Sequence, residues 1–335
     1  MGKQRHQSRL LTKKAYKKDM SKTELWRGVY PALLTPFTAE GTIDYDMFKK
    51  NFLAQIDAGV AGLIIAGSLG EVSTLSTQEK YDLLVFAKKH VPKHIPVILN
   101  IAEQTTIDAV NAAKEAERLG ADGLMLLPPM RYRASDREVV TYFKAVAAAT
   151  DLSIMIYNNP VDYAIHVTVE MFEQLEVCPN IDAVKESTRD LTNITRMINR
   201  FGDRFKILGG VDTIALESQL VGAHGSVAGL VDAFPRETVA IYRLAEAGRL
   251  DEALAIYRWF MPLLELDIHP RLVQYIKLAA TAEGLSNEYV RAPRLPLAGE
   301  ELARVQKIIK DAIATRPELP DYLNLPTRTT IEQAS

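Results

Sequence analysis

The chain has 335 residues, 40 Lys and Arg against 42 Asp and Glu, and 47% hydrophobic residues, which is the composition of an ordinary globular protein with a large core. A formal net charge of -2 lacks the basic excess of a nucleic-acid-binding protein, and no apolar run approaches the roughly 18 residues of a membrane span. We therefore expect a small-molecule partner, not a nucleic acid or a membrane. The single cysteine, Cys178, excludes an internal disulfide and fits a reducing, cytoplasmic location.

Residues 1–24 differ from the rest of the chain. Lysines and arginines dominate the first 22 residues, where the only acid is Asp19. Such a segment buries little apolar surface, so we predict a basic disordered arm. A transit peptide is the alternative, but the segment lacks a convincing apolar face.

From residue 28 onward, short apolar runs alternate with amphipathic segments of helical period. The predicted strands are 28–34, 62–66, 96–100, 123–127, 153–157, 182–185, 205–208 and 225–229. The helices predicted after them are 44–57, 77–90, 106–119, 136–149, 168–175, 191–200, 213–221 and 235–247. This alternation predicts an α/β protein, a (β/α)8 TIM barrel over residues 25–248. An open doubly wound sheet is the alternative, but no G-x-G-x-x-G follows the first strand.

The barrel is followed by a predicted C-terminal helical extension, residues 249–315, with helices at 250–264, 271–283 and 299–314. Residues 316–335 hold three prolines and a Thr-Arg-Thr-Thr stretch, which indicates an irregular tail. Either segment is a candidate for oligomer contacts.

Polar residues gather where the predicted strands end, which in a barrel is the catalytic face. They are Thr35, the turn Gly67-Ser68-Leu69-Gly70-Glu71, Tyr157, Lys185 and the run Gly210-Val211-Asp212. We expect them to converge on one mouth.

Lys185 ends the apolar run Ile181-Asp182-Ala183-Val184-Lys185. Desolvation of its ammonium lowers the pKa of a buried lysine and can leave a neutral amine that attacks a carbonyl. The alternative is a strand-end lysine that extends its charge to water.

Two further candidates have both a functional and a structural interpretation. Backbone N–H groups around Ser68, together with its hydroxyl, suit a carboxylate, although a plain turn also uses glycines. The phenol of Tyr157 suits proton transfer, although buried tyrosines are commonly core residues.

Together with their spacings, five motifs carry a family resemblance. They are the run from Gly28 to Phe37, the turn Gly67-Ser68-Leu69-Gly70-Glu71, Tyr157-Asn158-Asn159-Pro160, Val184-Lys185-Glu186 and Gly222-Ala223-His224-Gly225. They resemble the dihydrodipicolinate synthase/N-acetylneuraminate lyase family of class I, Schiff-base-forming lyases, over roughly residues 28–314.

The resemblance implies an imine between Lys185 and a 2-oxo acid, with Tyr157 as the proton shuttle. Ser68 and the backbone at Gly67 and Leu69 would hold the substrate carboxylate. The remaining candidate substrate-binding residues are Thr35, Asp162, Gly210 and Asp212, of which Asp212 is also a candidate helix cap. The family uses no metal or organic cofactor, and many members are homotetramers or dimers of dimers. The six histidines show no H-x-x-x-H or H-E-x-x-H spacing, which also disfavours a metal site.

The chain departs from the pattern of the synthases at three places. Leu69 replaces a second hydroxyl residue, and Asp162 replaces an arginine that binds the second substrate's carboxylate. Met130-Arg131-Tyr132 replaces a Tyr-Tyr pair, of which one tyrosine reaches the neighbouring subunit's site and takes part in a shared proton relay. Either Tyr132 substitutes for that tyrosine, or the shared relay is absent. Lysine biosynthesis is disfavoured accordingly.

Local sequence at 210–213 and 259–264 is similar to the branch that degrades 4-hydroxyproline. That similarity predicts dehydration and deamination of 1-pyrroline-4-hydroxy-2-carboxylate to 2-oxoglutarate semialdehyde. The alternatives are a pyruvate-dependent aldolase of 2-oxo-3-deoxy sugar acids, 4-hydroxy-tetrahydrodipicolinate synthase, and a non-catalytic barrel that binds 2-oxo acids.

Overall fold

The computed structural model describes residues 25–129 and 132–326, and its described part is built on one sheet of eight parallel strands. The strands are β1 (Gly28–Pro31), β2 (Leu63–Ile65), β3 (Val97–Ile101), β4 (Gly123–Leu126), β5 (Ser153–Asn158), β6 (Ile181–Glu186), β7 (Lys206–Gly209) and β8 (Gly225–Ala228). They pair in the order β1-β8-β7-β6-β5-β4-β3-β2. A bridge between Ala32 and Ile64 brings the first and last strands of this order together, so the sheet closes into a barrel.

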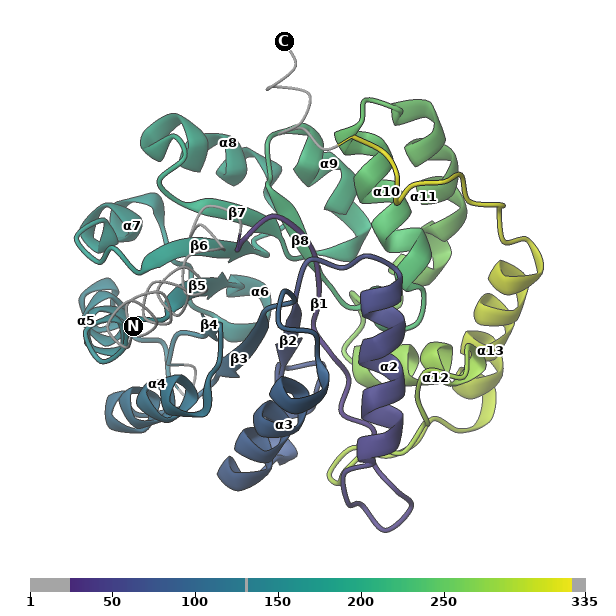
Figure 1. Ribbon diagram of the computed structural model, residues 1–335, viewed down its shortest axis with the longest axis horizontal. Coiled ribbons are helices and arrows are strands. Elements are labelled where there is room, and N and C mark those ends of the chain that lie inside the picture. The colour runs from purple at the N-terminus through teal and green to yellow at the C-terminus, as the bar shows by residue number, and fades with distance from the viewer. Residues whose placement is uncertain (1–24, 130–131, 327–335) are drawn as a thin grey trace, which may run out of the picture.

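Helices surround the sheet on its outside, as Figure 1 shows. They are α2 (Tyr45–Asp57), α3 (Thr77–His90), α4 (Thr106–Leu119), α5 (Asp136–Ala147), α7 (Val169–Leu175), α8 (Leu191–Phe201), α9 (Ala215–Leu220) and α10 (Pro235–Glu246). Because the helices cover the sheet, strands such as β3 are buried along their whole length, which explains their largely apolar sequence. The predicted (β/α)8 TIM barrel is confirmed.

Side-chain caps fix where several helices begin. The Ser76 hydroxyl accepts a hydrogen bond from the Glu79 N–H, and the Glu79 carboxylate accepts one from the Ser76 N–H. Ser135 and Glu138 form the same reciprocal pair at the start of α5. This pair leaves fewer helix-terminal N–H groups without a partner.

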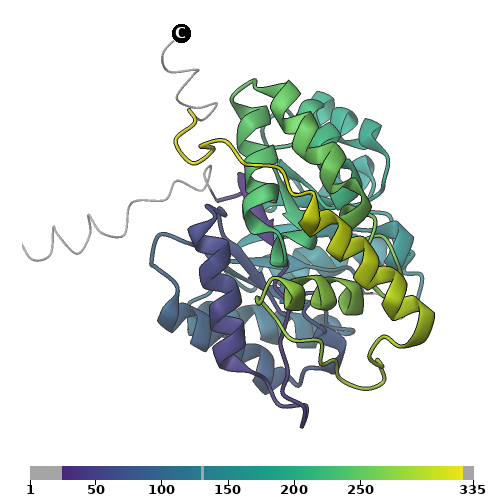
Figure 2. The ribbon, with the colours of Figure 1, turned by 90° about the vertical axis from the view of Figure 1, so that its right-hand side faces the viewer.

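Three helices follow the barrel: α11 (Leu250–Leu264), α12 (Leu272–Ala282) and α13 (Gly299–Ala314). They pack beside α10 and α2 on one flank of the molecule (Figure 2). Residues 316–326 have no regular structure and return over the outer helices. The Arg243 guanidinium donates a hydrogen bond to the Leu325 carbonyl oxygen at 2.6 Å, and the Tyr322 hydroxyl donates one to the Ala58 carbonyl oxygen at 3.2 Å.

Two local differences from the sequence prediction bear on the site. A short helix, α6 (Pro160–Tyr163), follows β5, and the predicted helix 213–221 divides into a 3-10 turn, η2 (Asp212–Ile214), and α9. The divide is at Ile214, whose backbone is not helical (φ -133°, ψ 23°). The predicted basic arm 1–24, Met130 with Arg131, and residues 327–335 lie outside the described part.

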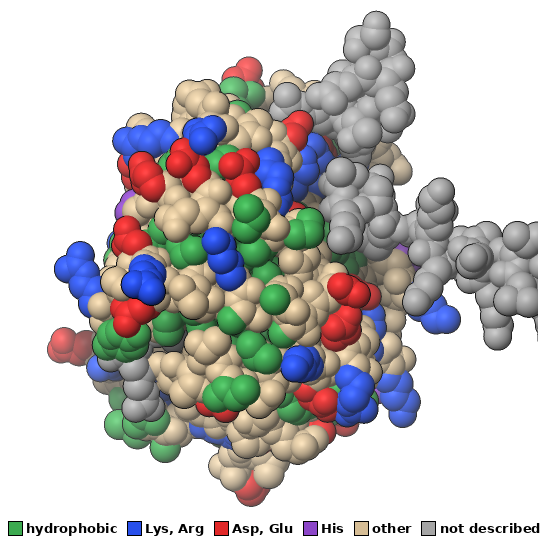
Figure 3. Space-filling view, turned by 90° about the vertical axis from the view of Figure 1, so that its left-hand side faces the viewer, with side chains coloured by type: hydrophobic (Ala, Val, Ile, Leu, Met, Phe, Trp, Pro, Cys, Tyr) green, Lys and Arg blue, Asp and Glu red, His purple; other side chains and the backbone are tan. Residues whose placement is uncertain are grey.

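The surface over α4, α5 and α7 is drawn in Figure 3, where Lys and Arg side chains are interspersed with Asp and Glu. Within the described ranges, none of the helices has the length and apolar character needed to cross a membrane.

Candidate functional site

A cavity of about 1610 Å³, its open mouth included, lies at the carboxyl ends of the strands. Residues from the barrel strands and the turns after them line it: Ala32, Ser68, Leu69, Met125, Tyr157, Lys185, Gly210 and Ala228. The segment between α11 and α12 adds Asp267–Pro270, and the chain after α12 adds Arg294. The C-terminal extension therefore supplies one wall of the cavity.

Lys185 lies on β6 beside Tyr157 on the neighbouring β5, with which it is in register. Its Nζ lies 4.1 Å from the centre of the Tyr157 ring. The lysine stem runs along Gly210, where a Cβ would lie 2.7 Å from Lys185 Cγ and 2.8 Å from Cε. The nearest atom to that Cβ would be Ser187 Oγ at 2.1 Å, so a side chain at 210 would displace Ser187, the lysine stem or both.

The amine of Lys185 is buried, with 7% of the residue exposed. Desolvation lowers the pKa of Lys185, and the nearby Asp267, Tyr163 and Asp212 oppose this effect. A lowered pKa increases the fraction of neutral amine, which is the form that attacks a carbonyl carbon.

The Tyr157 hydroxyl points into the same cavity and accepts a hydrogen bond from Asn159 Nδ2 at 3.1 Å. Burial raises the pKa of Tyr157 above its ordinary value. The phenol therefore keeps its proton at neutral pH and can donate it to a developing oxyanion or to a leaving hydroxyl.

Ser68 is held in the turn after β2 and points into the cavity. Its hydroxyl forms a hydrogen bond with the hydroxyl of Tyr163, the last residue of α6. Leu69 also lines the cavity but has no polar group to offer. Gly67 is not in the lining. A side chain at this position would extend towards Met125, which is a lining residue.

Thr35 has a structural role in this turn. Its hydroxyl donates to the Gly70 carbonyl oxygen at 2.7 Å, and the residue is not in the cavity lining. A direct contact between Thr35 and substrate stays a prediction.

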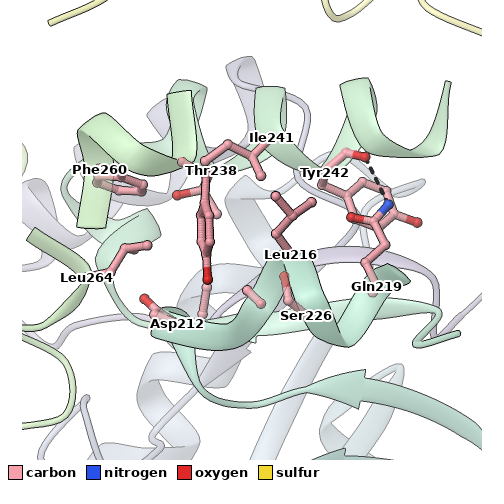
Figure 4. Close-up of a pocket in the computed structure, with 13 residues that line it drawn as sticks. Asp212, Leu216, Gln219, Ser226, Thr238, Ile241, Tyr242, Phe260 and Leu264 are labelled. Carbon is pink, nitrogen blue, oxygen red and sulfur yellow. Dashed lines mark hydrogen bonds between the residues drawn. The ribbon is translucent and has the colours of Figure 1, made fainter. Parts of the chain in front are cut away.

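Asp212 also lies outside the lining, and its role in substrate binding stays a prediction. Its carboxylate accepts the N–H of Leu230 at 2.8 Å and that of Gly229 at 3.1 Å. Asp212 instead borders a separate apolar pocket between β8 and the helices α9, α10 and α11, which Leu216, Ser226 and Phe260 also line (Figure 4). The carboxylate is thus engaged by backbone groups and is not available to a bound acid.

Charged groups of both signs surround the cavity mouth. Asp162 is exposed and accepts a hydrogen bond from Asn159 Nδ2 at 2.7 Å. Asp267 lies opposite in the lining, and its desolvation, with the neighbouring Asp212, raises the pKa of its carboxyl well above the ordinary value. Arg294 is the cation of the C-terminal wall.

The sequence analysis missed several cavity residues. Asp267, Arg294 and Ser187 were not identified. Tyr132, the expected substitute relay, is 56% exposed, and its hydroxyl donates to Glu138 Oε1 at 3.3 Å. It is not in the cavity lining of its own chain.

A buried ion pair fixes the Ser68 turn to the C-terminal extension. Lys277 of α12 donates to Glu71 Oε1 at 2.6 Å, and both side chains are 0% exposed. The Arg291 N–H donates to Glu71 Oε2 at 3.2 Å, and the Arg294 guanidinium lies 3.6 Å from the same oxygen. Sequence spacing gave no signal for this pair, whose residues are 206 positions apart.

Within the part of the chain that the structure describes, no three His, Cys, Asp or Glu side chains are grouped so as to hold a metal ion. The polar groups that line the cavity include the lysine amine, hydroxyls and carboxyls.

A (β/α)8 barrel whose mouth holds a buried lysine against a buried tyrosine has the architecture of a class I, Schiff-base-forming lyase. Comparisons with known proteins agree. The chain matches the Dihydrodipicolinate synthetase family over residues 25–312 and belongs to that family. Its members are class I lyases that form a lysine Schiff base with pyruvate and use no metal or other cofactor.

Relatives with assigned names lie within the same family. The chain is 32% identical over 286 residues to the 4-hydroxy-tetrahydrodipicolinate synthase of Moorella thermoacetica, an alignment that covers 85% of this chain and 98% of the relative. It is 33% identical over 276 residues to that of Exiguobacterium sibiricum, with 82% and 92% covered. The solved synthase structure from Methylacidiphilum fumariolicum SolV superposes with a TM-score of 0.81 at 29% identity, covering 86% of this chain and 97% of that one.

Proposed function

We propose that Lys185 forms the imine, at C2 of a 2-oxo acid or a cyclic imino acid. The observation that carries this proposal is the buried amine of Lys185 on the face of the Tyr157 ring, inside the cavity at the carboxyl ends of the strands. The lowered pKa of Lys185 provides the neutral amine that such an attack needs.

The neighbouring groups fit the steps of imine formation. Attack of the amine at C2 places a proton on nitrogen and negative charge on the substrate oxygen. Transfer of the proton to that oxygen, and of a second proton from the Tyr157 phenol, releases water and leaves the iminium. Ser68 and the N–H groups of its turn are placed to hold the C1 carboxylate.

For the substrate we propose 1-pyrroline-4-hydroxy-2-carboxylate. Addition of the lysine to C2 opens the ring and leaves its nitrogen as an amine at C5. Loss of a C3 proton gives an enamine, which expels the 4-hydroxyl as water. The double bonds then shift to an imine at C5, and two waters hydrolyse the imines at C2 and C5 to give 2-oxoglutarate semialdehyde, ammonia and free Lys185.

Asp162 favours this substrate over one with two carboxylates. Its side chain lines the mouth, where a second carboxylate would meet a like charge. The hydroxypyrroline has one carboxylate, which Ser68 and its turn would engage. Leu69 removes one polar contact from that turn without removing the hydroxyl of Ser68.

The second candidate is 4-hydroxy-tetrahydrodipicolinate synthase, the activity in the names of the relatives. Arg294 favours it, because a guanidinium in the cavity lining can pair with the carboxylate of a second substrate. An aldolase of 2-oxo-3-deoxy sugar acids would use the same imine, and the choice between these reactions depends on the groups at the mouth.

Ammonia release from the hydroxypyrroline carboxylate by the purified protein tests the substrate. We expect ammonia and the semialdehyde in equal amounts, and neither product with Lys185→Ala. Condensation of pyruvate with aspartate semialdehyde, without any ammonia release from the hydroxypyrroline, would refute our first choice in favour of the synthase. A homotetramer, or dimer of dimers, is part of the same proposal, and light scattering after size-exclusion chromatography tests it.

A further inference from the structure

Tyr163 holds a position in the cavity that none of the expected roles accounts for. It ends α6, its hydroxyl is hydrogen-bonded to Ser68, and its ring packs edge-on against Tyr157 with 5.5 Å between ring centres. Ser68 and Tyr163 are 95 residues apart and come from different strand ends of one chain. The pair therefore joins the turn after β2 to the turn after β5, on either side of the lysine.

We propose that Tyr163 is a further catalytic residue, which together with Ser68 forms a proton relay contained within a single chain. This inference rests on the imine at Lys185 proposed above and deepens it. Both residues line the cavity that Lys185 also lines, so a molecule bound to the lysine shares the cavity with this pair.

The chemistry of two bonded hydroxyls suits the proton transfers that an imine requires. Each hydroxyl both donates and accepts, and in this pair either oxygen can be the donor. When one member takes a proton from the nitrogen of the first adduct, the other releases one to its oxygen, which gives the carbinolamine, and the pair ends with the protons with which it began. The Tyr157 phenol then protonates the hydroxyl, the C2–O bond breaks, and water leaves the iminium. The same pair can take the C3 proton in exchange for one passed to water.

The surroundings keep Tyr163 ready for this role. Burial raises the pKa of the Tyr163 phenol, so the group holds its proton at neutral pH. The Tyr163 side chain lies close enough to Lys185 for each to affect the other's pKa. The phenol therefore interacts electrostatically with the amine that gains and loses protons in the reaction.

Hydrogen bonds at both ends of its loop fix the position of Tyr163. The Asn159 side chain accepts the N–H of Asp162 at 3.1 Å, and the Asn159 carbonyl accepts that of Tyr163 at 3.1 Å. At the far end, the Asn158 amide bonds both the N–H of Val167, at 2.9 Å, and its carbonyl oxygen, at 3.1 Å. Asn158 also donates to the buried Glu186, next to Lys185. The loop is thus tied to the strands that carry Tyr157 and the lysine.

Tyr132 does not serve this cavity from within its own chain. It is more than half exposed and bonded to Glu138 on α5. The phenol that faces Ser68 is that of Tyr163, so the relay needs no residue from a second subunit. The matched control is Tyr289, a tyrosine that is 46% exposed and lies outside the cavity lining.

Exchange of the C3 hydrogens of pyruvate for deuterium, followed by NMR in D2O, tests the relay without a second substrate. At saturating pyruvate we expect Tyr163→Phe to slow exchange by roughly 100-fold or more, the usual contribution of a positioned acid or base. Tyr289→Phe should exchange at the unmutated rate. Both variants should keep the circular dichroism spectrum of the unmutated protein and should still be trapped by borohydride, Tyr163→Phe more slowly.

Ser68→Ala and the Ser68→Ala/Tyr163→Phe double variant separate a relay from two independent structural effects. In a relay the double variant is about as slow as the slower single variant, whereas independent effects multiply. Exchange by Tyr163→Phe within threefold of the unmutated rate, or multiplying effects in the double variant, would overturn the relay and leave the imine intact. If the unmutated protein is not trapped with pyruvate, the imine at Lys185 is refuted, and the relay with it.

Discussion

Replacing Lys277 by methionine should destabilise the fold strongly, because it leaves Glu71 buried without its main partner. The ammonium donates to Glu71 at 2.6 Å and to the Tyr289 carbonyl oxygen at 2.5 Å, and both charged side chains are 0% exposed. Removing one member of a buried pair typically costs about 3–5 kcal/mol. The Arg291 N–H and the Arg294 guanidinium remain near Glu71, so we expect the free energy of unfolding to fall by about 3 kcal/mol.

Urea unfolding of four proteins measures this effect: the unmutated chain, Lys277→Met, Glu71→Leu and the double variant. The double variant removes both charges and should recover most of the stability that either single variant loses. Because Glu71 ends the turn that carries Ser68, Lys277→Met should also weaken pyruvate binding. A loss below about 1 kcal/mol for Lys277→Met, or a double variant as unstable as the sum of the single ones, would contradict the account of this pair.

Four further predictions concern the cavity. Gly210→Ala places a methyl 2.7 Å from Lys185 Cγ and should displace the amine. We expect trapping by pyruvate and borohydride to be roughly 100-fold slower and the free energy of unfolding in urea to fall by about 1–3 kcal/mol. Unchanged trapping would show that the path of the lysine tolerates a side chain at 210. Burial lowers the pKa of Lys185, so the trapping rate should rise with pH through that lowered pKa and level off below the ~10.4 of a free lysine. Asp267→Asn removes the acid that most raises the pKa of Lys185 and should move this rise to lower pH; a pH profile that does not move, or moves upward, would rule out that coupling. Asp162→Asn should tighten the binding of a 2-oxo acid with two carboxylates by about fivefold. In the same trapping assay, the binding of pyruvate should stay within threefold of that in the unmutated protein. Equal effects on both acids would show that Asp162 does not select the substrate.

The fold was predictable from the sequence because its signals are local. Apolar runs located each of the strands to within a few residues, and the helices at Thr77–His90, Thr106–Leu119 and Gly299–Ala314 have the predicted bounds. The short helix α6 was missed because four residues show no period.

The site was predictable only in part, because strand ends are local but side-chain partners are not. Lys185 and Tyr157 could be brought together because both lie at strand ends on neighbouring strands. Asp212 also follows a strand, yet its side chain turns to the backbone of Gly229 and Leu230, which sequence periodicity does not reveal. Asp267 comes from the extension beyond the barrel, whose packing over the mouth is set by tertiary contacts.

The central claim is that Lys185 forms the imine, and borohydride reduction in the presence of pyruvate tests it most directly. Intact mass and peptide mapping should show one reduced pyruvate per chain, attached at residue 185 and absent from Lys185→Ala, which should keep the circular dichroism spectrum of the unmutated protein. An adduct on another lysine, or the same adduct yield in Lys185→Ala, would contradict the account.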